Sequence, residues 1–173
     1  FRWTVKLGWH EAVANHFSVR SEGRRFLLNP DKMHFARIRA SDLVEYDSED
    51  PDTMKREDAP DHTAWGLHGA IHRLTDHRCA LHLHTKYATA LASLADSTLP
   101  PIDQNTAMFF DRVAVDEDYG GLAFEEEGER VCSHLKDPKT KVLVMGNHGV
   151  LAVGASPAEA FTTLYYFERA CET

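Results

Sequence analysis

Short runs in which apolar and polar residues alternate recur along the chain, and alternation of this kind predicts β-strands. Two such runs, residues 13–20 and 25–30, are separated by the turn-forming Ser21-Glu22-Gly23 and predict a hairpin. Further strands are expected within residues 79–84, 108–115, 141–144 and 149–153, and after a helical turn in residues 41–47. Both halves of the chain are therefore expected to supply strands to one sheet.

Helical spacing of apolar residues separates these strands. Residues 63–74 predict a helix that starts at Thr63, a residue type that caps helices. Ser156-Pro157 opens a final helix that extends to about Ala170. The remaining expectations are a helix end at residues 1–8, an exposed loop at 48–60, helices at 87–94 and 125–135, and a turn at 118–121. Strands mixed with helices of this length favour one three-layer α/β/α domain across residues 1–173.

The composition agrees with a globular domain and excludes several kinds of partner. A chain of 173 residues with 43% hydrophobic content can bury a sizeable core. The formal charge of -8, without a basic tract, argues against binding to nucleic acid or to an anionic membrane. The three cysteines are widely spaced and predict no disulfide framework, so we expect a reducing, cytoplasmic location. No apolar run has the length of a membrane span, and the absence of an initial Met predicts a truncated N-terminus.

The clearest chemical signal is a pair of histidines, His82 and His84, at the end of a predicted strand. Two residues apart on an extended strand, both imidazoles point the same way. His148 is the third candidate, because it follows the apolar run 142–145 and lies between two glycines where the backbone can turn. Three histidines with an open position would suit a catalytic divalent metal. The alternative is that His82 and His84 are two ordinary polar strand positions.

Two more histidines lie four residues apart on the predicted helix at residues 63–74. His68 and His72 would share a helix face, but no Glu follows the first of them, so the metalloprotease pattern H-E-x-x-H is absent. We expect them to pack in the interior or to support the metal site from behind.

Several short motifs follow one another in an order that resembles the class II aldolase and adducin family over nearly the whole chain. They are Asn15-His16-x-Ser18-x-Arg20, Leu28-Asn29-Pro30, His68-x-x-Ile71-His72, His82-x-His84-Thr85, Asn147-His148-Gly149 and Ala158-Glu159-Ala160 with Glu168-Arg169-Ala170-Cys171. The resemblance implies an α/β/α sandwich around a mixed, largely antiparallel sheet. It also implies a metal bound by His82, His84 and His148, and a tetramer with active sites between subunits.

The resemblance assigns further roles. Zinc is the expected metal, with iron, manganese or cobalt as alternatives. Tyr119 matches the tyrosine that serves as an acid in a neighbouring subunit of the sugar-phosphate aldolases, although a Tyr-Gly-Gly turn is an equally good interpretation. The candidate substrate-binding residues are Asn15, His16, Asn29 and Thr63.

The chain also departs from the aldolase pattern. Ala64 stands where the aldolases have the Glu that acts as general acid and base. His62 replaces a phosphate-binding serine, which makes a phosphorylated sugar a doubtful substrate. Glu11 and Asp61 are the nearest carboxylates that could substitute, but solvated positions are the favoured interpretation for both.

Three functions follow from these observations. The favoured one is a metal-dependent carbon–carbon lyase that acts on a small hydroxy- or oxo-acid by retro-aldol cleavage or decarboxylation, since decarboxylation needs no base at position 64. The second is a non-enzymatic, adducin-like module for assembly or partner binding. The third is an iron-dependent oxygenase-decarboxylase, although the common non-haem iron pattern has two histidines and a carboxylate.

Overall fold

A seven-stranded sheet forms the centre of the computed structural model, which describes residues 1–118 and 125–173. The strand order is β3-β2-β1-β4-β7-β6-β5. All neighbouring strands are antiparallel except β5 and β6, which are parallel. The predicted mixed, largely antiparallel sheet is therefore confirmed. The strands are β1 (His16–Arg20), β2 (Arg25–Leu28), β3 (Val44–Asp47), β4 (Cys79–Leu83), β5 (Val113–Asp116), β6 (Val142–Met145) and β7 (Gly149–Gly154).

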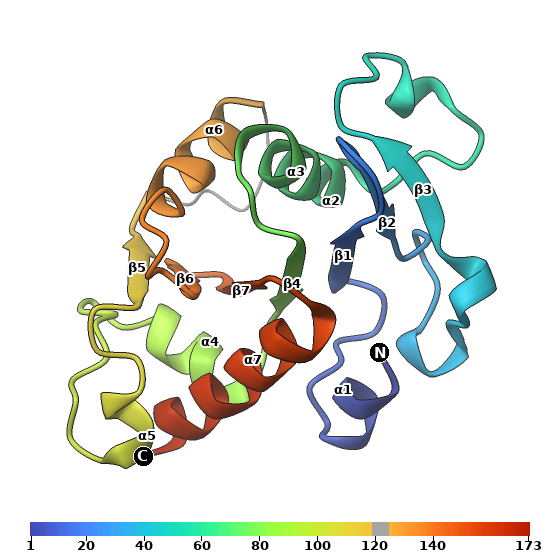
Figure 1. Cartoon of the computed structure of the whole chain (residues 1–173). Helices are drawn as coiled ribbons and strands as arrows, with labels where there is room; N and C mark the ends of the chain where they lie inside the picture. Colours follow the sequence, from blue (N-terminus) through green and yellow to red (C-terminus); the bar gives the residue numbers. More distant parts are fainter. Residues whose placement is uncertain (119–124) are drawn as a thin grey trace.

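Helices cover both faces of this sheet, which gives the predicted three layers (Figure 1). On one face lie α2 (His62–Ala64), α3 (Ala70–Leu74) and α6 (Glu125–His134). On the other lie α1 (Arg2–Lys6), α4 (Lys86–Ala92), α5 (Gln104–Ala107) and α7 (Pro157–Glu172). Short 3-10 turns occur at η1 (Phe35–Arg37), η2 (Ala40–Asp42) and η3 (Thr53–Lys55). No helix in the described part of the chain is long and apolar enough to cross a membrane.

Alternation along β4 explains how one strand serves two apolar cores. Leu81 and Leu83 belong to the core shared with α4 and α7, whereas Ala80 belongs to the core shared with α3 and α6. His82 must point to the same side as Ala80, because successive strand residues face opposite ways. The sheet thus delivers this imidazole to the α2–α3 side.

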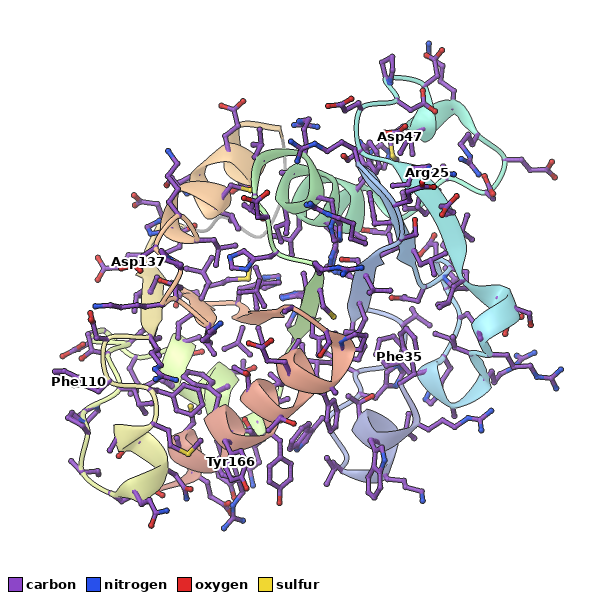
Figure 2. The ribbon with its side chains drawn as sticks, in the orientation of Figure 1. Arg25, Phe35, Asp47, Phe110, Asp137 and Tyr166 are labelled. Atoms are coloured by element: carbon purple, nitrogen blue, oxygen red, sulfur yellow. The ribbon has the colours of Figure 1, made fainter. Side chains whose placement is uncertain are left out.

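Side chains fill the space between the sheet and the helices (Figure 2). Phe35 is fully buried among them, while the charged Arg25, Asp47 and Asp137 lie exposed at the outside. This separation of apolar interior and charged exterior is what the composition predicted.

Residues 108–110 do not form the expected strand. Asp103 caps α5 by accepting a hydrogen bond from the Thr106 amide at 2.8 Å, and the chain then turns before β5 begins at Val113. Phe110 is 70% exposed and lies with Tyr166 at the surface (Figure 2). The apolar run was misleading because its side chains are not all buried.

The helix predicted for residues 63–74 starts and is built differently. Its N-cap is Asp61 and not Thr63, since the Asp61 carboxylate accepts hydrogen bonds from the amides of Thr63 at 2.7 Å and Ala64 at 3.2 Å. Between α2 and α3 the backbone adopts a π-helical segment, η4 (Trp65–Gly69). Single π-helical turns of this kind occur frequently at functional sites.

Candidate metal centre

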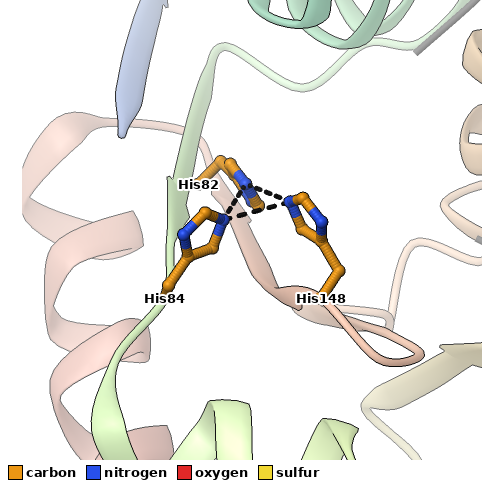
Figure 3. Close-up of side chains that lie close together, drawn as sticks. All are labelled: His82, His84 and His148. Atoms are coloured by element: carbon orange, nitrogen blue, oxygen red, sulfur yellow. Dashed lines mark hydrogen bonds between the residues drawn. The ribbon is translucent and has the colours of Figure 1, made fainter. Parts of the chain in front are cut away.

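Three imidazoles converge at the end of β4 (Figure 3). The Nε2 atoms of His82, His84 and His148 form a triangle with sides of 3.0, 3.0 and 3.1 Å. Two nitrogens that bind one ion at 2.0–2.1 Å lie no more than about 4.2 Å apart, so this spacing is compatible with a shared ion. The structure therefore brings together the three predicted metal ligands, and the group is arranged as a candidate metal site.

Local backbone geometry places the third histidine. His148 lies in the tight turn between β6 and β7, where Asn147 has a φ of 57°. Asn tolerates this left-handed conformation better than most residues, so the turn does not depend on the flanking glycines for it. Gly149 has a different role: a Cβ there would lie 2.6 Å from Cδ2 of His84 and 2.7 Å from the carbonyl oxygen of Leu83. Only glycine lets the His84 ring occupy its position.

Acceptors behind the rings fix the nitrogen that each histidine offers. Nδ1 of His82 lies 3.0 Å from the carbonyl oxygen of Val150, and Nδ1 of His84 contacts the carboxylate of Glu11. Both partners only accept, so both Nδ1 atoms donate and, in the neutral rings, both Nε2 atoms present lone pairs. Histidine ligands of metals are typically oriented by such partners. The expectation that Glu11 is merely solvated is wrong, although its side chain is 58% exposed.

The arrangement suits a cation and not a set of three isolated histidines. Burial lowers the pKa of His82 well below 6.5, and burial together with the neighbouring His84 lowers the pKa of His148 to about 4. Neutral rings at pH 7 leave the lone pairs of His82 and His84 facing each other at 3.0 Å. A proton donated by His148 would satisfy only one of these contacts, whereas a divalent cation would satisfy every Nε2 atom. The donor set therefore fits a metal ion.

The three histidines lie on the wall of a pocket with a volume of about 320 Å³. The four predicted substrate-binding residues, Asn15, His16, Asn29 and Thr63, line the same pocket. Ala64 also lines it and is only 3% exposed, so no carboxylate occupies the position of the aldolase Glu. Asp61 is at the wall too, but its Oδ2 is engaged in capping α2.

Strained backbone is concentrated around this pocket. Ala12, Lys32, Asp111 and Asn147 are the non-glycine residues with positive φ in the described part of the chain. Lys32 lines the pocket, Ala12 adjoins the pocket residue Val13, and Asn147 precedes His148. Residues held in unfavourable φ/ψ regions cluster at ligand sites, because only a functional constraint maintains the strain.

A second histidine group lies directly behind the first and was not anticipated as a unit. His16 pairs with His82 across β1 and β4, and their ring centroids are 4.8 Å apart. Nδ1 of His16 lies 2.8 Å from Nε2 of His68, and the Ser18 hydroxyl lies 2.5 Å from Nδ1 of His68 and 2.7 Å from Nε2 of His72. His68 and His72 are completely buried, so they support the site from behind as one of the two expectations stated.

The signal for this second group was present on β1. His16 and Ser18 are two residues apart and must share a face, which is the face of His82. What the sequence did not reveal is that the helix carrying His68 and His72 packs on that face. Burial lowers the pKa of His16 and His68 well below 6.5 and that of His72 to about 3, so the group is neutral at pH 7.

A carboxylate from α7 holds the chain immediately after the metal ligands. Glu168 is 4% exposed and accepts hydrogen bonds from the Thr85 hydroxyl at 2.5 Å and from the amides of Tyr87 at 3.0 Å and Ala88 at 2.9 Å. These groups form the start of α4, where free amides favour a negative partner. Glu168 therefore fixes the junction that follows His84. The predicted acid Tyr119 lies outside the described residues.

The fold and the site together define a metal-binding α/β/α domain of the class II aldolase type. The family described as Class II Aldolase and Adducin N-terminal domain matches residues 1–173, and the chain belongs to it. Human gamma-adducin is 33% identical to it over 178 residues, which cover 99% of this chain and 25% of that protein.

Two solved structures extend the comparison. An aldolase II superfamily protein from Pseudomonas syringae has a TM-score of 0.87 and 31% identity, and the match covers 99% of this chain and 69% of that one. L-fuculose-1-phosphate aldolase from Thermus thermophilus has a TM-score of 0.79 and 26% identity, with 98% and 85% covered. The chain spans 66% of one bacterial relative and about a quarter of the adducins.

Proposed function

We propose that this domain is a metal-dependent carbon–carbon lyase that acts on a small hydroxy- or oxo-acid by decarboxylation or retro-aldol cleavage. The observation that carries the proposal is the triangle of Nε2 atoms, whose lone pairs are fixed on His82 and His84 by acceptors behind the rings. Zinc is the proposed ion, with iron, manganese or cobalt as alternatives.

A divalent cation held by His82, His84 and His148 would act as a Lewis acid toward the substrate oxygens and stabilise negative charge that develops on them. Among the pocket residues, Asn15 has a buried Nδ2 that makes no hydrogen bond within the described chain, and it is the proposed donor to the substrate. Asn29 uses its amide on the Phe17 amide and on the Asn15 carbonyl, so its proposed role is to shape the pocket.

The two remaining pocket residues are also engaged within the chain. The Thr63 hydroxyl contacts the Asp61 carboxylate, and Nδ1 of His16 contacts His68. We assign both the role of shaping the substrate site around the metal. A ligand that approaches the histidines has to pass their side chains, since both line the pocket.

Ala64 decides between the reactions. A retro-aldol cleavage needs a group that moves a proton, and the aldolase position for that group holds a methyl side chain here. Loss of CO₂ leaves negative charge for a metal to stabilise and needs no proton removed by residue 64. Decarboxylation of an oxo-acid is therefore the favoured reaction.

The test is a panel of hydroxy-acids, oxo-acids and sugar phosphates assayed with zinc-loaded wild type, Ala64→Glu and Ala64→Gln. Wild type should decarboxylate at least one oxo-acid and cleave sugar phosphates poorly. Ala64→Glu should raise any aldol cleavage by up to about 10²–10⁴-fold, the usual range for a general acid–base group, while the isosteric Ala64→Gln should not. Efficient cleavage of fuculose or ribulose phosphates by wild type would contradict the importance given to Ala64.

A non-enzymatic, adducin-like module is the second candidate, because human gamma-adducin is 33% identical across this domain and Ala64 lacks acid–base chemistry. The same panel separates the two functions. Turnover of no compound by a metal-loaded protein that binds a protein partner tightly would replace the lyase with the module.

We further propose that the chain forms a homotetramer in which Tyr119 lies near the metal of a neighbouring subunit. The proposal extends the family resemblance. Light scattering at micromolar concentration should give four times the monomer mass, and Tyr119→Phe should lower turnover without changing that mass. A monomer would sink this arrangement.

A further inference from the structure

Lys32 stands out among the residues around the pocket. It lines the wall and has a φ of 59°, in the left-handed region that L-residues with a long side chain rarely adopt. Among the described residues that line the pocket, it is the only lysine or arginine. A strained backbone and an isolated positive charge therefore coincide at one position.

The fold gains little from a lysine here. Its side chain is 84% exposed, and its ion pair joins it to the adjacent Asp31 at 3.2 Å. An exposed pair of this kind contributes little stability. Glycine would adopt the same φ without the clash of a Cβ atom. A residue that costs conformational energy and returns no packing is better explained by contact with a ligand than by folding.

The charges around the pocket point to an anionic ligand group. Asp31 and Asp61 are the carboxylates among the described lining residues, and the Oδ2 of Asp61 is held by the start of α2. The ammonium of Lys32 is on a flexible stem that can leave Asp31 for a better acceptor. A volume of about 320 Å³ is at the small end of ligand sites, which suits a compact acid.

We propose that Lys32 binds an anionic tail of the substrate while the hydroxy-carbonyl head lies at His82, His84 and His148. This assignment rests on the proposed function, and it narrows the substrate to a small acid with a second negative group. A carboxylate and a phosphate share the required chemistry. Lys32 is in this view a specificity-determining residue.

The experiment uses the zinc-loaded chain and three probes that share a 2-hydroxy-acid head. 2-Hydroxybutyrate has a neutral tail, malate a carboxylate tail and 3-phosphoglycerate a phosphate tail. Calorimetric titration of wild type should give about 5- to 10-fold tighter binding of one anionic tail, and the tail that is preferred identifies the group. In Lys32→Gln and Lys32→Gly this preference should disappear, while 2-hydroxybutyrate should bind as before. Lys136→Gln, an exposed lysine outside the pocket, is the matched control and should behave as wild type.

Thermal unfolding supplies a second measurement of opposite sign. Lys32→Gly should raise the Tm by about 2–4 °C, because glycine relieves the left-handed strain, even as the preference for the anionic tail is lost. A purely structural lysine would not give higher stability with weaker binding. Equal affinity of wild type for the neutral and both anionic tails overturns the role of Lys32 alone. Failure of all three probes to bind overturns the head site, and with it both proposals.

Discussion

The molecule contains two groups of three histidines, and they differ in what their nitrogens face. In the group at the end of β4, three Nε2 atoms point at one another from 3.0–3.1 Å. In the group behind it, His16, His68 and His72 form a chain in which Ser18 links the last two rings. The first group leaves lone pairs without donors, whereas the second satisfies most of its own hydrogen bonds.

This difference shows that metal binding depends on where the second nitrogen of each ring is held. Val150 and Glu11 occupy the Nδ1 atoms of His82 and His84 from behind and so direct the Nε2 atoms to a common point. A hydroxyl between two rings, as at Ser18, spreads the rings apart and uses their nitrogens. Four experiments can break or sharpen the comparison.

The largest effect is expected from removing one histidine of each group. His148→Ala should lower metal affinity by more than about 100-fold, since loss of a ligand must exceed the 10–100-fold cost of losing a supporting residue. His72→Asn should keep one equivalent of metal. Elemental analysis after dialysis measures both, with circular dichroism to confirm folding. A full equivalent retained by His148→Ala would show that the ion is held elsewhere.

Ser18→Ala tests the second group through stability. The substitution leaves Nδ1 of His68 and Nε2 of His72 buried without their partner, so the free energy of unfolding should fall by about 2–4 kcal/mol. Urea unfolding measures this change, and the metal content should stay at one equivalent. Ser133→Ala, at an exposed serine of α6, is the control and should change the free energy by less than about 0.5 kcal/mol. Similar losses in both variants would contradict the role of Ser18.

Acid should destabilise the second group in a defined window. The folded-state pKa of His72, lowered to about 3 by burial, lies below its unfolded value of 6.5. The unfolded state therefore binds the extra proton between these values, and the stability present above pH 6.5 is lost as the pH falls toward 3. The contribution of His72 is about 1.4 kcal/mol per pH unit. Urea unfolding of the chelator-treated protein from pH 6.5 to 4.5 should show a slope smaller by this amount in His72→Gln. Equal slopes would mean that His72 is protonated in the folded state.

The smallest effect is expected from the support behind His84. Glu11→Gln keeps the shape of the side chain and removes its charge, so the metal affinity should fall by about tenfold. Competition with a chromogenic chelator measures the affinity. Glu49→Gln, an exposed glutamate outside the pocket, should have no effect. An unchanged affinity in Glu11→Gln would show that the contact with His84 does not support the ion.

The parts of the site that lie on regular elements could be predicted from the sequence. Alternation along β4 brings His82 and His84 to one side, and the apolar run before His148 correctly indicated a buried strand that ends at that residue. The sheet and its helical layers followed from the same periodicities. These features depend on local patterns that each residue type favours directly.

The parts that were missed depend on loops and on helix register. Glu11 reaches His84 because the loop turns at Ala12, whose φ of 43° has no sequence signal in alanine. The π-helical segment at Trp65–Gly69 sets which ring meets Ser18, and no periodicity of 3.6 residues announces it. Asp61 displaced Thr63 as the cap because both types favour that position and only the local geometry chooses between them.

The clamp made by Glu168 also has a consequence for how the protein is synthesised. His82 and His84 leave the ribosome 64 or more residues before His148, and the Glu168 that holds Thr85 follows it by 83 residues. A nascent chain that ends just after β7 already contains all three imidazoles but lacks the carboxylate that fixes the start of α4. An arrested chain of that length should therefore hold a metal ion less firmly than the released protein, so that the last helix made is the one that completes the site.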